Sequence, residues 1–394
     1  MSRLETAGLV PGDLVAVALP PGPDWVDIVR AVWDAGAALL PVDQRLPEAE
    51  ATALVRRARP TVVLSPGGWA RPPGGTPTAV GVALIVHTSG TAGEPKLVQF
   101  DRRAIDAAVT ASALALNATP QDRWLCCLPL AHVGGTLVLL RSVLLGAPVA
   151  VHPSFDPVAV SAEHGAAFVS VVPTMLVRLL DAGSDLSRFR AILVGGAPFP
   201  PALRLRAEGS GAKVLETYGL TESCGGVVYD GLPLAGVGVR INGDGCIELR
   251  GPMTMLAYRS DPEGTTRAFT PDGWLRTGDA GAIDADGHLR VEGRHDDLII
   301  TGGEKVWPQE VEEALRDHPK VADVAVAGRA DPEWGQRVVA YVVPSDAHSP
   351  PSLAELREHI SCTLPRFEAP RELVILVEGI PRTFSGKIRR AALA

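Results

Sequence analysis

The sequence lacks several patterns that would place it in a well-known class of protein. Its five cysteines form no Cys-x-x-Cys pair and no cluster with histidines, which argues against a zinc site and fits reduced thiols in a cytosol. A formal net charge of -8 argues against general nucleic-acid binding, which needs basic residues to displace counterions. No His-Glu-x-x-His, Gly-x-Ser-x-Gly or Gly-x-Gly-x-x-Gly arrangement supports a hydrolase or a dehydrogenase.

Long apolar runs are also missing. The most apolar stretch, residues 136–151, is interrupted by Arg141 and Pro148 and is too short to span a bilayer comfortably. The N-terminal residues include early acidic side chains and no apolar signal-peptide core, so we expect a cytoplasmic protein that does not bind membranes. The chain has 394 residues, 46% of them hydrophobic, which is enough for a buried core and more than one domain.

Short apolar runs alternate with longer amphipathic stretches through the first half of the chain. Residues 14–19 and 82–86 predict strands, and residues 24–35 and 102–116 predict helices. Such alternation predicts parallel-rich sheets covered by helices. Residues 225–286 are rich in glycine, aspartate and short β-type runs, which predicts a β-rich subdomain. We therefore predict an α/β fold for the large N-terminal domain.

The C-terminal part of the chain predicts a small α+β domain. Pro308 begins a helix with acidic residues early and basic residues late, as the helix dipole favours. Strands at 321–326 and 337–343 and a helix at 353–364 follow. The polar segment 293–297 is interpreted as a linker. These features predict an N-terminal domain at 1–295 and a mobile C-terminal lid at 296–394.

The strand at 82–86 is followed by the sequence His-Thr-Ser-Gly-Thr-Ala-Gly-Glu-Pro-Lys, residues 87–96. Glycines let backbone N–H groups turn toward phosphate oxygens, hydroxyls add donors, and a lysine adds a positive charge. The spacing differs from a Walker A loop, because Gly90 and Gly93 are three residues apart and Leu97 follows the lysine. An ordinary Ser/Thr/Gly turn is the alternative, but the density of donors favours phosphate binding.

This segment resembles the signature loop of the adenylate-forming superfamily of acyl-CoA synthetases, peptide adenylation domains and luciferases. Four further segments agree with the superfamily in the same order: 216–222 with its aromatic-Gly-x-Thr-Glu motif, 273–279 with its ribose-binding aspartate motif, 291–304 with its hinge motif, and 381–387 with its C-terminal lysine motif. The resemblance implies that ATP activates a carboxylic acid as an acyl-AMP, whose acyl group then passes to coenzyme A. ATP, Mg²⁺ and coenzyme A are therefore expected.

The resemblance also assigns roles to single residues. Lys387 is expected to bridge the carboxylate and the α-phosphate, and Thr221, Glu222 and His132 complete the catalytic set. Glu222 is the expected Mg²⁺ ligand, because this cation prefers a carboxylate plus phosphate oxygens. A solvated surface position is the alternative for Lys387 and for Glu222. The residues expected to bind the nucleotide are Thr88, Ser89, Gly90, Thr91, Gly93, Lys96, Gly195, Gly196, Ala197, Pro198, Thr217, Tyr218, Gly219, Thr221, Asp279 and Arg294.

Two further sets follow from the same resemblance. The expected acyl pocket consists of His132, Val133, Gly134, Ser170, Pro173, Thr174, Gly225 and Gly226. Asp296 is the expected hinge for domain rotation. The expected coenzyme A tunnel consists of Gly302, Gly303, Glu304 and Trp307, where a tryptophan replaces a smaller aromatic residue and would narrow the tunnel.

Three features resemble the o-succinylbenzoate–CoA ligases of menaquinone biosynthesis: the short N-terminal region and the segments 128–135 and 170–175. The N-terminal region is also shorter than is typical for the superfamily. The second carboxylate of that substrate needs a cation or several donors, and Arg141, Arg178 and His132 are the candidates. The alternatives are a ligase for another aromatic or medium-chain acid, a stand-alone enzyme that loads a carrier protein, and an inactive nucleotide-binding protein. Amino-acid-activating members of the superfamily usually have an aspartate near the segment that resembles residues 131–135, so the lack of an acidic residue there disfavours amino-acid substrates. A homodimer is left open.

Overall fold

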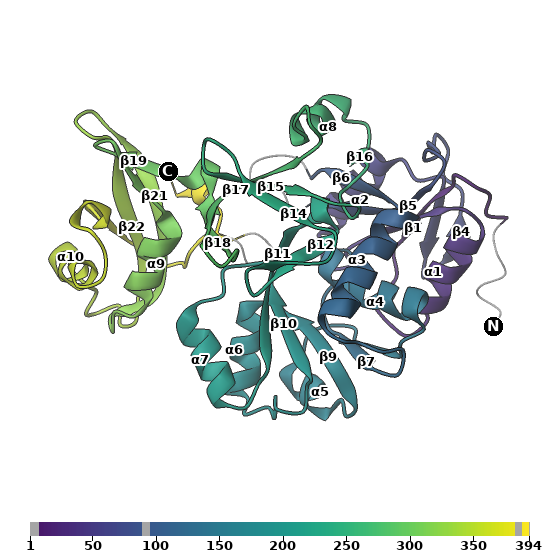
Figure 1. Cartoon of the computed structure of the whole chain (residues 1–394), viewed down its shortest axis with the longest axis horizontal. Coiled ribbons are helices and arrows are strands. Elements are labelled where there is room, and N and C mark those ends of the chain that lie inside the picture. Colours follow the sequence, from purple (N-terminus) through teal and green to yellow (C-terminus); the bar gives the residue numbers. More distant parts are fainter. Residues whose placement is uncertain (1–7, 89–94, 383–387, 394) are drawn as a thin grey trace. The chain divides into compact units, whose positions relative to one another are not determined.

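The computed structural model describes residues 8–88, 95–382 and 388–393 (Figure 1). The described residues form two compact units. The first unit contains residues 8–88, 95–239 and 249–275, and the second contains residues 240–248, 276–382 and 388–393. The domain boundary expected after residue 295 stays a prediction.

The first unit contains two seven-stranded sheets. The strands of the first sheet are β1 (Leu14–Val17), β2 (Ala38–Pro41), β3 (Val62–Ser65), β4 (Gly68–Ala70), β5 (Val82–His87), β6 (Leu97–Asp101) and β16 (Ala257–Tyr258). Their order is β16-β6-β5-β2-β1-β3-β4, and β1, β2, β3 and β5 pair in parallel. Every residue of β1 and β2 is buried, as expected for parallel strands covered on both faces. Helices α1 (Trp25–Asp34) and α2 (Glu48–Ala58) connect these strands.

The second sheet follows the same principle. Its strands are β7 (Arg123–Cys126), β8 (Val149–Val151), β9 (Ala166–Val171), β10 (Ala191–Gly195), β11 (Val214–Leu220), β12 (Gly225–Tyr229) and β13 (Leu232–Pro233), in the order β13-β12-β11-β10-β9-β7-β8. Strands β7 to β11 pair in parallel, and β12 and β13 add antiparallel edges. In Figure 1, helices α5 (Pro157–Ala162), α6 (Pro173–Asp181) and α7 (Pro201–Gly209) lie beside this sheet.

The predicted helix at 102–116 is α3 (Arg102–Ala115), which begins where the Asp101 side chain accepts a hydrogen bond from the Ala104 N–H. The apolar stretch at 136–151 is divided between the buried helix α4 (Val133–Leu145) and β8, and Gly146 ends the helix in a left-handed conformation. Within the described ranges, no helix combines the length and the apolarity needed to cross a membrane.

A four-stranded sheet occupies much of the region predicted to be β-rich. Its strands are β14 (Gly238–Ile241), β15 (Cys246–Arg250), β17 (Leu275–Ile283) and β18 (Leu289–Arg294), in that order. The short helix α8 (Pro262–Ala268) precedes β17. The segment 293–297, interpreted as a linker, ends β18 and continues into the 3-10 helix η2 (His295–Asp297), because Gly293 and Arg294 pair with β17.

The C-terminal α+β part of the second unit agrees with the sequence pattern. Its strands are β19 (Ile299–Thr301), β20 (Glu304–Val306), β21 (Val321–Asp331), β22 (Gly335–Pro344) and β23 (Glu372–Ile375). Helix α9 (Pro308–Arg316) begins at the predicted proline, and α10 (Leu353–Ser361) begins with a capping box between Ser352 and Glu355. Both helices contribute buried side chains, such as Val311 and Leu356, to one apolar core with β21 and β22.

Candidate functional site

The two ends of the expected phosphate-binding segment are held side by side. The Thr88 N–H donates to the Lys96 carbonyl at 2.9 Å, and the Lys96 N–H donates to Thr88 Oγ1 at 3.1 Å. These bonds continue the antiparallel pairing of β5 with β6, in which His87 faces Leu97. Four other residues expected in this segment lie outside the described residues: Ser89, Gly90, Thr91 and Gly93.

Lys96 and Glu222 meet at the ring of Tyr258. Lys96 Nζ lies 4.4 Å from the centre of the ring, and the Tyr258 hydroxyl donates to Glu222 Oε1 at 2.7 Å. Burial, and then the charge of Glu222, raise the pKa of Tyr258 far above its usual value, so the hydroxyl stays a donor. Sequence reasoning missed Tyr258, which lies in none of the five motifs. Pairing of β16 with β6 brings it close to Lys96, and the Met255 N–H, which donates to the Glu222 carbonyl at 2.8 Å, holds the same segment beside Glu222.

The surroundings of Glu222 fit a magnesium ion that arrives with a nucleotide. Glu222 lies in the 3-10 helix η1 (Thr221–Ser223), directly after Thr221. Among the described residues, no group of three or more His, Cys, Asp or Glu side chains is placed to hold a metal ion. Mg²⁺ is usually held by one or two carboxylates together with phosphate oxygens and water. A single carboxylate with a fixed hydrogen-bond partner matches that requirement.

The expected adenine-binding residues lie at the ends of neighbouring parallel strands, β10 and β11. Gly195 pairs with Thr217, and a Cβ atom on Gly195 would lie 2.2 Å from Thr217 Oγ1, so only glycine fits. Gly196 has a φ of +79°, and Ala197 and Pro198 follow it on an exposed turn. Tyr218 comes next to Thr217 in β11, as the motif requires. Ligands of open α/β sheets commonly bind at this edge of the sheet.

Three glycines pack the strands β11 and β12 tightly together. A Cβ atom on Gly219 would lie 2.0 Å from the Gly225 carbonyl oxygen, and one on Gly226 would lie 3.1 Å from Thr217 Cβ. Gly225 has a φ of +91°, and a Cβ atom there would lie 2.6 Å from Leu137 Cδ1 of helix α4. The nucleotide motif and two expected acyl-pocket residues, Gly225 and Gly226, therefore share one compact hairpin against α4.

His132 lies in a cluster of charged and imidazole side chains at the start of α4, where Val133 and Gly134 begin the helix. Its Nε2 atom lies 3.2 Å from Arg45 Nη2 and 3.7 Å from Asp43 Oδ2. Its ring stacks on His87, with centroids 5.7 Å apart. Sequence reasoning missed Asp43 and Arg45, because no motif marks residues 43–45. It also assigned no role to His87, although this residue begins the expected phosphate segment.

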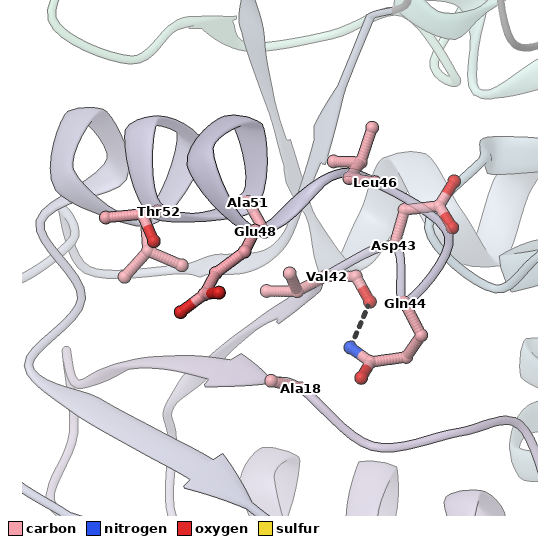
Figure 2. A pocket seen from close by; sticks show the side chains of 9 residues that line it. Ala18, Val42, Asp43, Gln44, Leu46, Glu48, Ala51 and Thr52 are labelled. Carbon is pink, nitrogen blue, oxygen red and sulfur yellow. Dashed lines mark hydrogen bonds between the residues drawn. The ribbon is translucent and has the colours of Figure 1, made fainter.

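A pocket of about 310 Å³ lies beside the same loop. Figure 2 shows the Gln44 side chain along this pocket, where its amide donates to the Val42 carbonyl at 3.1 Å. The Asp43 side chain extends from the same segment in a different direction (Figure 2). Asp43 is buried and Gln44 is exposed, and both residues line the pocket.

The other two cations considered for a second substrate carboxylate have different surroundings. Arg141 is buried in α4, donates to Ser112 Oγ at 2.8 Å and lies over the Trp124 ring. Arg178 is exposed on α6 and lies over Phe155. Three expected pocket residues lie nearby in sequence: Ser170 in β9, and Pro173 and Thr174 at the start of α6.

In the second unit, Asp279 and Arg294 are partners. They face each other across β17 and β18, and Arg294 Nη1 donates to Asp279 Oδ1 at 3.0 Å. The same nitrogen donates to the Thr277 carbonyl at 3.1 Å. A Cβ atom on Gly278, whose φ is +73°, would lie 2.9 Å from Arg294 Nη2. The residues expected to bind ribose are therefore brought together by strand pairing.

The expected hinge and tunnel residues lie in the β19–β20 hairpin or close to it in sequence. Asp296 is exposed in η2. Gly302 and Gly303 form the turn between the two strands with positive φ values, and the Gly302 N–H donates to the Trp334 carbonyl at 2.8 Å. Glu304 begins β20 and is exposed, while Trp307 packs against Gly293, where an added Cβ atom would lie 3.3 Å from the indole.

Lys387 lies outside the described residues, but its neighbours on both sides are anchored. Arg382 forms a β-bridge with Ile388 and donates to both carboxylate oxygens of Asp323, at 2.9 and 2.8 Å. Arg390 donates to Asp297 at 3.0 Å, beside the expected hinge, and to the buried Glu312 at 2.5 Å. These ion pairs tie the C-terminal segment to η2, α9 and β21.

Comparison with known proteins decides the family. The family model "AMP-binding enzyme" matches residues 2–73 and 65–247, and "AMP-binding enzyme C-terminal domain" matches residues 310–387. The chain belongs to the AMP-binding enzyme family. This result confirms the family inferred from the motifs.

Relatives of known name give the same family. A probable 2-succinylbenzoate–CoA ligase of Mycobacterium tuberculosis is 41% identical over 329 residues, which cover 79% of this chain and 84% of the relative. A 2-succinylbenzoate–CoA ligase of Bacillus subtilis is 36% identical and covers 79% of this chain and 68% of the relative. The o-succinylbenzoate CoA synthetase of Bacillus subtilis, solved with its acyl-adenylate intermediate, is 30% identical with a TM-score of 0.88, over 99% of this chain and 90% of that one. The predicted α/β fold is thereby confirmed.

Proposed function

We propose that this chain is a 2-succinylbenzoate–CoA ligase that acts through an acyl-adenylate. The observation that carries the proposal is the meeting of Lys96 and Glu222 at Tyr258, directly beside the paired ends of the phosphate segment. This arrangement places a lysine that can bind phosphate oxygens close to a carboxylate that can bind the accompanying metal ion. The names of the relatives supply the acid, and they agree with the expected place in menaquinone biosynthesis.

In the first step, a substrate carboxylate oxygen attacks the α-phosphorus of ATP. The new P–O bond forms as the bond to pyrophosphate breaks, which yields acyl-AMP and pyrophosphate. Two anions must approach each other, so preorganised donors and cations are needed. Thr88, Lys96 and Thr221 are assigned to the phosphates, and Lys387 to the charge that develops between carboxylate and α-phosphate. Mg²⁺ bound at Glu222 supplies charge neutralisation for the phosphate oxygens.

In the second step, the thiolate of coenzyme A attacks the acyl carbon, the bond to AMP breaks, and an acyl thioester forms. The C-terminal lid is proposed to rotate about Asp296 between the two steps, withdrawing Lys387 and presenting Gly302, Gly303 and Glu304 to the thiol. Support comes from the turn at Gly302 and Gly303, which is exposed and whose positive φ values suit close approach by a ligand. A homodimer, a cytoplasmic location and a carrier protein as acceptor stay predictions.

A pyrophosphate-release assay tests the proposal. Purified protein is given ATP, Mg²⁺ and one of three acids (2-succinylbenzoate, benzoate or octanoate), each with and without coenzyme A. We expect release with 2-succinylbenzoate, formation of the thioester only when coenzyme A is present, and a fall of ~10²–10³ in rate for Lys387→Ala. If the protein prefers another acid, the proposed substrate is wrong, but the proposed formation of an acyl-adenylate and a thioester still stands. Binding of ATP without acid-dependent release would overturn the proposal.

A further inference from the structure

Strand β16, which contains Tyr258, is two residues long and pairs with β6 through Ala257 and Tyr258. So short a strand needs further contacts to hold a side chain in one orientation. The next residue, Arg259, adds such a contact, because its N–H donates to the Leu97 carbonyl at 2.8 Å. Leu97 directly follows Lys96, whose ammonium lies over the Tyr258 ring. The backbone of Arg259 therefore ties the tyrosine to the segment that carries the lysine.

The side chain of Arg259 is anchored in a different part of the first unit. Its Nε donates to the Ala58 carbonyl at 2.9 Å, and its Nη2 donates to the Thr76 carbonyl. Ala58 is the last residue of helix α2, and the last carbonyls of a helix have no partner within the helix. The guanidinium supplies such a partner, and its positive charge suits the negative end of the helix dipole.

These two hydrogen bonds compensate for the burial of a cation. Arg259 is 8% exposed, and burial, followed by the charge of Arg59, lowers its pKa. A charge taken out of water is tolerated where its donors meet acceptors. The two accepting carbonyls are themselves linked, because the Thr76 N–H donates to the Arg59 carbonyl at 2.8 Å. The planar guanidinium thus joins the end of α2 and the loop before β5 to the residue that follows Tyr258.

We propose that Arg259 is a positioning residue that holds the Tyr258 hydroxyl against Glu222 and so orients this carboxylate for the magnesium ion. The inference rests on the proposed function, in which Glu222 binds the Mg²⁺ that accompanies ATP. Arg259 acts through the neighbouring tyrosine, because its own side chain is directed to the carbonyls of Ala58 and Thr76.

The contact between tyrosine and glutamate is sensitive to small displacements. The Tyr258 hydroxyl lies 2.7 Å from Glu222 Oε1, so a shift of the strand by ~1 Å would break the hydrogen bond. The Met255 N–H holds one end of the segment, because it donates to the Glu222 carbonyl at 2.8 Å. Arg259 holds the other end, directly beside the tyrosine. Loss of its two-point contact therefore frees the end of the segment that sets the direction of the phenol.

The magnesium dependence of pyrophosphate release measures this role. We expect Arg259→Met to raise the Mg²⁺ concentration for half-maximal release by roughly tenfold, as for a lost partner of a metal-binding carboxylate, with little change in the KM for 2-succinylbenzoate. In the Tyr258→Phe background, Arg259→Met should cause no further increase, because the hydroxyl through which it acts is already absent. Independent, multiplicative increases for the two substitutions would overturn the inference.

NMR of the full chain with ¹³Cζ-labelled tyrosine tests the contact without any need for activity. The sequence has 4 tyrosines, and the Tyr258 signal is assigned with Tyr258→Phe. In the native protein, Glu222→Gln should move this signal, because the hydroxyl loses a charged acceptor. In Arg259→Met, the signal should no longer respond to Glu222→Gln. A response equal to that of the native protein would overturn the inference, whereas the proposed ligase activity is decided by acid-dependent pyrophosphate release.

Arg188→Met is a matched control in the same unit. Arg188 donates to the Ser161 carbonyl at 2.7 Å and to the Val160 carbonyl, so it also binds carbonyls in the last turn of a helix, α5. We expect this variant to lose thermal stability but to keep the native Mg²⁺ requirement and the native Tyr258 signal. If Arg188→Met raises the Mg²⁺ requirement as much as Arg259→Met does, the effect is a general loss of stability and the specific role is wrong.

Arg259→Lys decides the question if Arg259→Met does not fold. Lysine keeps the positive charge but lacks the planar fork that donates to two carbonyls at once. We expect the folded variant to need a Mg²⁺ concentration between those of the native protein and Tyr258→Phe. A native Mg²⁺ requirement in Arg259→Lys would show that the two-point contact does not position the tyrosine, and would overturn the inference.

Discussion

The hydroxyl of Tyr258 donates to Glu222 Oε1 at 2.7 Å, although the two residues are 36 positions apart in the chain. One carboxylate oxygen is thereby oriented by a neutral donor whose pKa is raised by burial and by Glu222 itself. Lys96 lies against the same ring. Partners that orient a metal-binding carboxylate matter nearly as much as the ligand. Tyr258 is therefore expected to tune the requirement for Mg²⁺.

Tyr258→Phe should weaken the use of Mg²⁺ while the fold is kept, because the ring still packs but the donor is lost. We expect the Mg²⁺ concentration for half-maximal pyrophosphate release to rise by roughly tenfold. The control is Tyr341→Phe, which removes a hydroxyl that accepts from Arg329 in the other unit and should leave the Mg²⁺ requirement unchanged. If Tyr258→Phe needs the same Mg²⁺ concentration as the native protein, Tyr258 does not affect the use of Mg²⁺.

Gly219→Ala should destabilise the first unit and abolish adenylate formation. The added Cβ atom would lie 2.0 Å from the Gly225 carbonyl oxygen, and backbone on both strands must shift to make room. Overpacking of this kind costs about 1–3 kcal/mol or more. Thermal unfolding measures the loss. Gly22→Ala, where nothing lies within 4 Å of the added atom, is the control and should unfold at nearly the native temperature.

Asp296→Pro should slow thioester formation more than adenylation. The residue is exposed in the 3-10 helix η2, and proline restricts its φ and the conformation of His295 before it. Single-turnover measurements of the two half-reactions separate these effects. Asp296→Ala removes the same carboxylate without restricting the backbone and should affect the second half-reaction much less. Equal losses in both half-reactions for the proline variant would contradict a hinge at this position.

Glu368→Gln should make the protein more stable at pH 8 and less sensitive to pH. Burial, and then the nearby carboxylate of Glu310, raise the pKa of Glu368 to about 7, and one of its oxygens is buried without a hydrogen-bond partner among the described residues. The folded state therefore binds a proton that the unfolded state releases above its ordinary pKa of 4.5. The resulting stability is complete below that value and is lost as pH rises through about 7.

Urea unfolding between pH 4.5 and 8 checks this dependence. The native protein should lose stability over that range relative to Glu368→Gln, whose neutral side chain is indifferent to pH. Glu358→Gln removes an exposed carboxylate of helix α10 in the same unit and serves as the control for loss of charge. Parallel pH profiles for the native protein and Glu368→Gln would show that Glu368 does not titrate in this range.

Local sequence patterns predicted many of the helices and strands. Helix α9 begins at Pro308 and α10 begins after Ser352, because a proline and a capping box act within one turn of the chain. The order of five short motifs was enough to recognise the family, since their residues are close together within each motif. The motifs that contain Asp279 and Arg294 follow each other closely in sequence. They lie in adjacent antiparallel strands, and the two residues pair there.

Only the folded chain decided which distant residues meet. Arg45 lies beside His132, and Tyr258 lies beside Glu222, although no motif and no short stretch of sequence contains both members of either pair. The order of strands in a sheet depends on packing among many residues that are far apart in sequence. Neither hydrophobic periodicity nor a short motif predicts that order. The chemical types needed at the site can be read along the chain, whereas the hydrogen bonds that orient them arise from the arrangement of the sheets.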